Sequence, residues 1–242
     1  MKVTLRIYRF DPSQDEAPYY RNYGIEAEPH ERILDCLNRI KWEQDGTLSY
    51  RMSCAHGVCG SDAMKINGRC ALACQKLVKD CEPDLILVEP LPAFTVLKDL
   101  IVDLSPFFEK VDFIRPYLIA GSPPEKERLQ SPEDRKKMGE SIRCILCACC
   151  TAACPVSNEN ETFLGPAPLV QAFRRIFDSR DIDKVERLEQ LNVENGVWAC
   201  LNHYECTRVC PKEIPVTKYI NATKREIKKA SANTVGPKET VG

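Results

Sequence analysis

The stretch Cys144-Ile145-Leu146-Cys147-Ala148-Cys149-Cys150-Thr151-Ala152-Ala153-Cys154-Pro155 contains five cysteines, and four of them, all but Cys149, form a run with the spacing C-x₂-C-x₂-C-x₃-C-P. A second run, from Cys200 to Cys210-Pro211, has the same spacing but carries His203 at one of the four positions. The two runs hold seven of the 14 cysteines in a chain of 242 residues. Spacing this regular predicts ligand sets for metal–sulfur groups rather than scattered buried thiols.

The two runs predict two iron–sulfur clusters. In proteins that carry two clusters on such runs, the fourth cysteine of each run ligates the cluster of the other run. This crossing yields a set of four thiolates, which suits [4Fe–4S], and a set of three, which suits [3Fe–4S]. The first set is Cys144, Cys147, Cys150 and Cys210, and the second is Cys154, Cys200 and Cys206. Structural zinc also binds C-x₂-C pairs, but a double run with two Cys-Pro endings fits clusters better.

The role of His203 is the open question in the second set. Imidazole binds cluster iron in Rieske centres. A histidine beside a cluster could instead relay protons, because its unperturbed pKa is about 6.5, or form a hydrogen bond at a subunit contact. Imidazole is longer and more rigid than the side chain of cysteine. We therefore predict that His203 does not hold a fourth iron.

A third ligand set is predicted upstream, in Cys54-Ala55-His56-Gly57-Val58-Cys59-Gly60-Ser61-Asp62 and Cys74. Plant-type [2Fe–2S] ferredoxins use C-x₄-C-x₂-C and a distant fourth cysteine. Here an aspartate replaces the third cysteine, and a carboxylate keeps the negative charge of a thiolate although it is a harder ligand. The predicted ligands are Cys54, Cys59, Asp62 and Cys74. In the alternative, Asp62 only caps a turn and Cys70 completes the site.

The remaining cysteines and His56 match no ligand position. With no second Cys/His pair nearby, His56 is interpreted as a loop residue rather than as a Rieske-type ligand. Free cysteine usually behaves as a small buried apolar residue. We expect that role for Cys36, Cys70, Cys81 and Cys149.

Apolar periodicity predicts strands in the first half of the chain and helices in the second. The expected strands are residues 3–10, 23–28, 63–66, 70–73 and 85–89, with one helix at 31–42. The expected helices of the second half are 96–108, 168–177, 182–191 and 216–230, with a polar linker at 122–137. We expect two domains, 1–105 and 106–230, followed by a disordered tail, 231–242.

Composition excludes several classes of function. The formal net charge is −1, from 34 basic and 35 acidic residues, which argues against a nucleic-acid-binding protein. No apolar run approaches the roughly 20 residues that span a bilayer, and the N-terminus shows neither a secretory nor a transit pattern. We therefore expect a soluble chain, made where it works. A disulfide framework is disfavoured, because reducing compartments keep thiols reduced.

A plant-type ferredoxin half followed by a helical ferredoxin half, with sites for 2Fe, 4Fe and 3Fe clusters in that order, resembles one family. This family consists of the iron–sulfur subunits of succinate:quinone oxidoreductases, which comprise the succinate dehydrogenases and fumarate reductases. The similarity runs from Val3 to about Lys229. It includes residues 51–63 and 144–155, Leu164-Gly165-Pro166-Ala167, Phe177-Asp178-Ser179-Arg180-Asp181 and Asn195-Gly196-Val197-Trp198. The resemblance implies an α+β protein, with an N-terminal β-grasp domain followed by an all-α domain like that of bacterial ferredoxins.

The resemblance also implies a function and partners. The chain would carry electrons in a succinate dehydrogenase, with no catalytic residue of its own. It would lie between a flavoprotein that bears FAD and a membrane anchor that offers quinone, as a peripheral subunit on the cytoplasmic face of a bacterial inner membrane. The electrons would pass through [2Fe–2S], [4Fe–4S] and [3Fe–4S] in turn. A quinol:fumarate reductase subunit and a free-standing ferredoxin with several clusters are the alternatives.

Two features of the chain depart from the family pattern, and one agrees with it. Many relatives carry a tryptophan shortly after the cysteine that matches Cys154, and it helps to bind quinone. Residues 156–161 contain no aromatic side chain, so we expect the quinone contacts to come mainly from the anchor. His203 stands where relatives usually have an apolar or small residue. An aspartate at the position of Asp62 is an iron ligand in some bacterial members.

Overall fold

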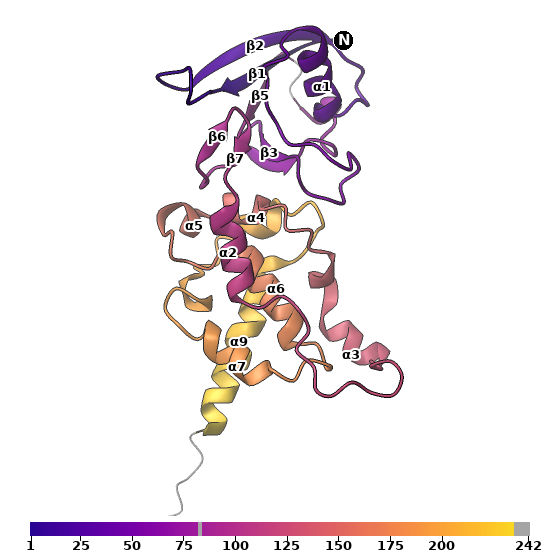
Figure 1. The fold of residues 1–242 in the computed structure, drawn as a ribbon, viewed down its shortest axis with the longest axis vertical. Helices are drawn as coiled ribbons and strands as arrows, with labels where there is room; N and C mark the ends of the chain where they lie inside the picture. The colour runs from indigo at the N-terminus through magenta and orange to yellow at the C-terminus, as the bar shows by residue number, and fades with distance from the viewer. Residues whose placement is uncertain (82–83, 235–242) are drawn as a thin grey trace, which may run out of the picture.

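The computed structural model describes residues 1–81 and 84–234. It places a mixed sheet at one end of the molecule and a group of helices at the other (Figure 1). The five strands of the sheet are β1 (Lys2–Arg9), β2 (Tyr19–Glu26), β3 (Ala63–Ile66), β4 (Arg69–Leu72) and β5 (Ile86–Glu89). Their order is β2-β1-β5-β3-β4, in which only the β1–β5 pair is parallel.

Helix α1 (Ile33–Glu43) packs against the sheet. Its apolar residues recur at helical spacing, so that Ile33, Leu34, Leu37 and Ile40 lie on one face and are buried. The expected strands and helix of this half are confirmed to within a few residues. The β3–β4 hairpin turns at Asn67-Gly68, with φ values of 46° and 78°, as a two-residue turn of this composition requires.

The prediction of one helix at residues 96–108 is wrong. Two short strands, β6 (Val96–Lys98) and β7 (Ile101–Val102), form an antiparallel hairpin there, and helix α2 (Ser105–Phe113) begins only afterwards. The turn between the strands holds Asp99, which has φ 47° and is 1% exposed. A left-handed residue at this point interrupts a helix.

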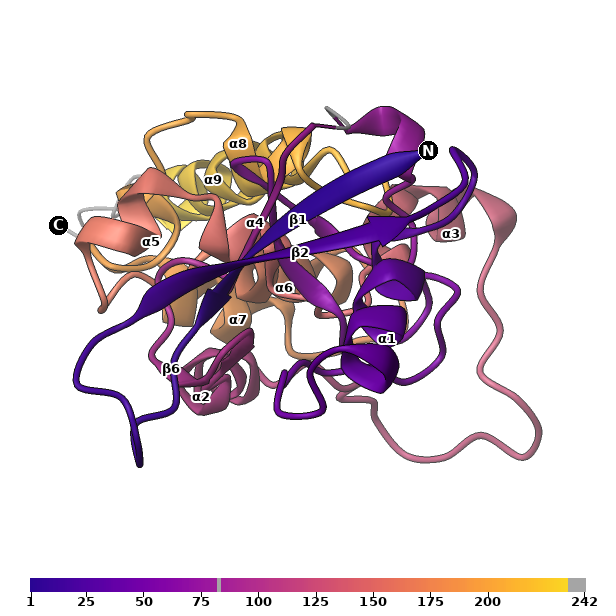
Figure 2. The same cartoon turned by 90° about the horizontal axis from the view of Figure 1, so that it is seen from above.

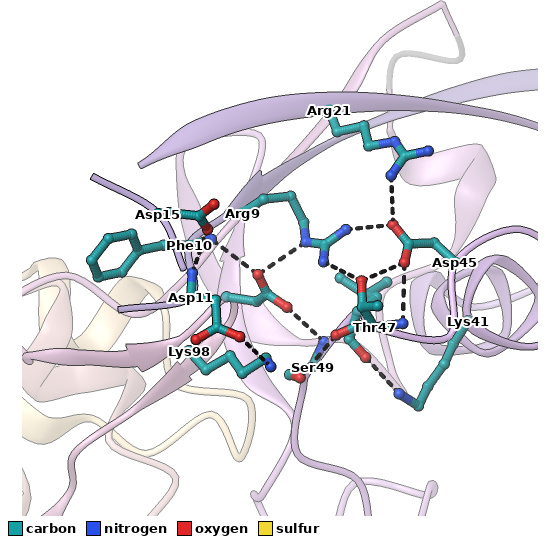
Figure 3. Close-up of polar contacts among 12 residues, drawn as sticks. Arg9, Phe10, Asp11, Asp15, Arg21, Lys41, Asp45, Thr47, Ser49 and Lys98 are labelled. Carbon is teal, nitrogen blue, oxygen red and sulfur yellow. Dashed lines mark hydrogen bonds and ion pairs between the residues drawn. The ribbon is translucent and has the colours of Figure 1, made fainter. Parts of the chain in front are cut away.

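Tertiary hydrogen bonds hold this turn in place. The carboxylate of Asp99 accepts from Arg9 Nε at 2.9 Å, from the Phe10 amide at 2.9 Å and from the Ser49 amide at 2.8 Å. The Arg9 guanidinium also pairs with Asp45 (2.6 Å), so one buried cation joins three segments of the N-terminal half (Figure 3). Partners between 50 and 90 residues away in the sequence therefore decide the local structure at Asp99.

The second half is built on helices α6 (Pro166–Ile176) and α9 (Val216–Thr234). The Phe173 ring of α6 stacks on the Tyr219 ring of α9, with centroids 4.2 Å apart. The remaining helices are α3 (Pro132–Lys137), α4 (Cys149–Ala152), α5 (Pro155–Glu159), α7 (Lys184–Leu191) and α8 (Glu205–Arg208). Short 3₁₀ turns occur at Val78–Asp80, Gly139–Arg143 and Val197–Ala199.

Two expectations for this half need correction. The polar linker ends in helix α3, whose N-terminus is capped by Ser131 accepting from the Asp134 amide at 3.1 Å. Helix α9 continues to Thr234, so the first four residues of the expected disordered tail are helical. The rest of that tail, residues 235–242, lies outside the described residues.

The two halves meet at the cysteine-rich loops. Figure 2 shows β1 and β2 crossing above the helices, with α1 to one side. The buried core of the sheet also includes Cys149, Ala152, Ala167 and Val209 from the helical half. Within the described ranges, no helix has the length and apolarity to span a membrane.

Candidate iron–sulfur centres

The loop that carries Cys54 and Cys59 turns its amides toward sulfur. The amides of Val58 and Cys59 donate to Cys54 Sγ at 3.4 and 3.3 Å, and the Cys54 amide lies 3.5 Å from Cys59 Sγ. Backbone hydrogen bonds, led by that of His56 and followed by those of Cys59 and Val58, lower the pKa of the Cys54 thiol to about 6. The loop thus favours thiolate at neutral pH, which is the form that binds iron.

Asp62 and Cys74 lie together at the base of this loop. Asp62 is 2% exposed, and its Oδ2 accepts from the Cys74 amide at 2.5 Å. Its Oδ1 is buried and has no hydrogen-bond partner among the described residues. A buried carboxylate oxygen without a partner is costly, and an iron ion would satisfy it. Burial, together with the hydrogen bond and charge of Asp62, raises the pKa of Cys74 to about 12.

Cys70 lies elsewhere. It is buried on β4 and lines a groove shared with Arg69, Ala152 and Val209, where the sheet meets the helical half. Burial raises the pKa of this thiol to about 11, and Cys147 is one of its charged neighbours. The structure therefore brings Asp62, and not Cys70, to Cys74.

The predicted four-thiolate set lines one cavity. Its walls come from the first cysteine run, from α6 and from the segment after Cys210. They include all four predicted ligands: Cys144, Cys147, Cys150 and Cys210. Burial raises the pKa of Cys144, Cys150 and Cys210, and the charge of neighbouring thiols of the set adds to the effect. Thiolates gathered in an apolar cavity need a cation, which the iron of a cluster supplies.

The predicted three-thiolate set lines a second cavity. Cys154, Cys200 and Cys206 all belong to its wall, together with His203 and Tyr204. Burial raises the pKa of Cys206, and the charges of Cys154 and Cys200 act in the same direction. His203 thus lies at the site, as the spacing of the second run predicts.

The two cysteine runs share one backbone form. Ala148, directly after Cys147, has φ 64° and ψ −4°, and Tyr204, directly after His203, has the same two angles. Leu146 and Asn202, one residue before Cys147 and His203, are also left-handed, with φ 54° and 61°. Alternating left-handed residues turn successive amides to one side, which suits binding of a negatively charged group.

The described residues contain no group of three or more His, Cys, Asp or Glu side chains close enough to hold a single metal ion. The cysteines instead surround two cavities, each lined by one complete predicted set. The donor types and the unpartnered Asp62 oxygen fit groups of several iron and sulfur atoms. Cys36, Cys81 and Cys149 are buried free thiols, as expected.

The cysteine spacing gives no indication of several residues that lie beside the centres. Thr217 Oγ1 lies 3.4 Å from Cys206 Sγ, and the Ile214 amide donates to Cys210 Sγ at 3.4 Å. Lys212 lines the four-thiolate cavity and donates to Gly57 O at 3.0 Å. Its place directly after Cys210-Pro211 was the one signal that could have indicated it.

Known proteins share this arrangement. Residues 4–109 match the family described as "2Fe-2S iron-sulfur cluster binding domain", and residues 140–214 match "4Fe-4S dicluster domain". The succinate dehydrogenase iron-sulfur subunit of Coxiella burnetii is 41% identical over 229 residues, which cover 93% of this chain and 97% of that protein. The mitochondrial succinate dehydrogenase iron-sulfur subunit 3 of Arabidopsis thaliana is 40% identical over 218 residues, or 88% and 71% of the two chains.

A solved structure shares this fold, and its name refers to an Sdh complex, in keeping with the names of these relatives. A chain of the Mycobacterium smegmatis Sdh1 complex in the apo form superimposes with a TM-score of 0.85 at 27% identity, over 97% of this chain and 99% of that one. Neither a fumarate reductase nor a free-standing ferredoxin is favoured by these relatives. The chain belongs to the family of succinate dehydrogenase iron–sulfur subunits, and it carries electrons in that oxidoreductase through [2Fe–2S], [4Fe–4S] and [3Fe–4S] clusters.

Proposed function

We propose that three ligand sets hold the clusters: Cys54, Cys59, Asp62 and Cys74 for [2Fe–2S]; Cys144, Cys147, Cys150 and Cys210 for [4Fe–4S]; and Cys154, Cys200 and Cys206 for [3Fe–4S]. The observation that carries the proposal is that each crossed set lines a cavity of its own. The unpartnered oxygen of Asp62 supports the first set. When bound, the clusters supply the one-electron relay between FAD and quinone.

We further propose two domains, 1–105 and 106–230. The strand order β2-β1-β5-β3-β4 with α1 across the sheet supports a β-grasp ferredoxin domain. From Ser105 onward, the described part of the chain has only helices as named elements, which supports an all-α ferredoxin-like domain. The proposed boundary coincides with the start of α2.

The partners would cover opposite ends of this relay. Exposed apolar side chains border the [2Fe–2S] loop at Met52 (49% exposed) and Val58 (56%). Others border the [3Fe–4S] loop at Leu201 (68%) and Tyr204 (52%). Such residues are common in protein interfaces. We assign the surface around Met52 and Val58 to the flavoprotein that bears FAD, and the surface around Leu201 and Tyr204 to the membrane anchor that offers quinone. The chain would then be a peripheral subunit on the cytoplasmic face of a bacterial inner membrane.

Electron paramagnetic resonance (EPR) of the purified complex, oxidised and then stepwise reduced, tests the proposal. It should show one three-iron signal when oxidised, and then one two-iron and one four-iron signal on reduction. Cys74→Ser should alter only the two-iron signal, whereas Cys36→Ser, a buried thiol outside every set, should alter none. A complex with fewer than three signals, or purification of the chain without a flavoprotein and membrane fraction, would overturn it.

A further inference from the structure

The [2Fe–2S] loop rests directly on the [4Fe–4S] loop at Gly60. A Cβ placed on Gly60 would lie 2.7 Å from Cys147 Cβ, which is closer than such atoms pack, and 3.3 Å from Ile145 O, which is a tight contact. Gly60 also has φ +72°, which favours glycine. The absence of a side chain at this position therefore lets a loop of the first centre touch a ligand residue of the second.

A cation joins the same two loops. Lys212 lines the cavity of the four-thiolate set, and its Nζ donates to Gly57 O of the [2Fe–2S] loop at 3.0 Å, across 155 residues of sequence. Position 57 requires glycine, because its φ is +76° and the Gln75 side chain fills the space that a Cβ would occupy. Lys212 thus bonds the [2Fe–2S] loop and also belongs to the wall of the four-thiolate cavity.

No carboxylate of residues 1–81 and 84–234 forms an ion pair that offsets the charge of Lys212. Arg32 also donates to the [2Fe–2S] loop, at Ala55 O (2.7 Å), but its guanidinium pairs with Asp35 at 2.8 Å. Both ligand sets carry negative charge, so an unpaired cation between them acts on both.

We propose that Lys212 is a positioning residue that holds the [2Fe–2S] loop on the [4Fe–4S] loop and raises the reduction potentials of both clusters. An added electron is stabilised by a nearby positive charge, and the effect is stronger where the contact is partly shielded from water, as the half-buried bond from Lys212 to Gly57 is. The [3Fe–4S] cavity does not include Lys212 in its wall, so its potential responds less. The proposal rests on the ligand sets proposed above.

Potentiometric EPR titration of the purified holo-complex tests this role. Lys212→Met should lower the midpoint potentials of [2Fe–2S] and [4Fe–4S], with a smaller change at [3Fe–4S], and Lys212→Arg should restore them. Lys110→Met is the matched control, because Lys110 Nζ also bonds a distant carbonyl, Glu161 O at 2.6 Å, but lines neither cavity. Unmoved potentials, or an equal shift of all three clusters, would overturn the proposal. Missing clusters in the wild-type complex would instead refute the ligand sets.

Hydrogen exchange tests the contact without reference to activity. Gly60→Ala should speed exchange of the amides in residues 54–62 and lower the same two potentials. Gly68→Ala is the control, because Gly68 has nearly the same φ (+78°) but nothing within 4 Å of an added Cβ. Equal behaviour of the two variants would mean that backbone strain explains the effect, and the contact of Gly60 with Cys147 would then have no role in holding the [2Fe–2S] loop on the [4Fe–4S] loop.

Discussion

His203 occupies the same backbone position in its loop that Cys147 occupies in the other, since each precedes a residue with φ 64° and ψ −4°. His203 lines the cavity that also contains Cys154, Cys200 and Cys206 in its wall. The two loops therefore differ at this position in side chain and not in backbone form. In the proposed ligand set, the third centre has one thiolate fewer because His203 stands where the other run has a cysteine.

The first prediction is that His203 leaves the type of the third cluster unchanged. Three thiolates hold [3Fe–4S], so the oxidised complex should show the isotropic signal typical of three-iron clusters, both before and after His203→Ala. EPR of the two oxidised proteins is the measurement. If the wild-type site were silent when oxidised and gained that signal only in the variant, His203 would be a ligand of a fourth iron.

The second prediction concerns Asp62. Since its Oδ1 has no hydrogen-bond partner in the part of the chain that the structure describes, we expect Asp62→Cys to keep the [2Fe–2S] cluster with a changed potential, because a thiolate is a softer iron ligand. Asp62→Ala should lose the cluster. The control is Cys70→Ser, which should leave the signal intact, because Cys70 lines the groove beside Ala152 instead. Loss of the two-iron EPR signal in Cys70→Ser would show that the ligand assignment is wrong.

The third prediction concerns stability and pH. Burial by itself would raise the pKa of Asp45, but hydrogen bonds from Thr47, Tyr23 and Arg9 hold it well below its usual value. Among the described residues, Arg9→Met leaves the buried Asp99 carboxylate without an ion pair and Asp45 with only the exposed Arg21, and it should destabilise the N-terminal half by about 3–5 kcal/mol at pH 7. The exposed Arg6 on the same strand provides the control, Arg6→Met.

The sign of the pH effect follows from the lowered pKa. A carboxylate of this kind stabilises the fold above its unfolded pKa of about 4, and that contribution is lost as pH falls through the folded value. The difference in thermal-unfolding midpoint between wild type and Arg9→Met should therefore be largest near pH 7 and narrow below about pH 4. Circular dichroism melts across this range are the measurement. A constant difference at every pH would contradict the prediction.

The fourth prediction separates two neighbours after Cys154. Asn158 Nδ2 donates to Ala152 O at 3.1 Å and to Cys154 O at 2.8 Å, so it braces the loop of the third centre. Glu159 is exposed and makes no such contact among the described residues. We expect Glu159→Ala to leave the quinone KM unchanged, and Asn158→Ala to reduce the [3Fe–4S] content of the complex.

Steady-state quinone kinetics and EPR spin counts distinguish these outcomes. Tyr204→Ala, which removes an exposed ring beside the same cavity, should raise the quinone KM if quinone approaches from this face. A large rise in Glu159→Ala would show that residues 156–161 line the quinone site after all.

The sequence by itself predicted the ligand sets proposed here, and the structure gathers two of them around cavities. The positions of Cys144, Cys147 and Cys150 within a short loop constrain their geometry locally, so their spacing carries the chemistry of the site. The spacing of the second run, in which His203 replaces a cysteine, constrains its residues locally in the same way. Alternating apolar residues likewise predicted β1 and the β3–β4 hairpin, because the side-chain period of a strand is a local property.

Only the tertiary structure decided the features that depend on distant partners. Residues 96–98 and 101–102 form strands because Asp99, in the turn, is bound by Arg9 and by the Ser49 amide, and neither partner is visible in a local period. The bond from Lys212 to Gly57 spans 155 residues. Spacing along a chain describes which groups are near neighbours in sequence, whereas folding selects contacts among all of them, at a cost in chain entropy that no short motif records.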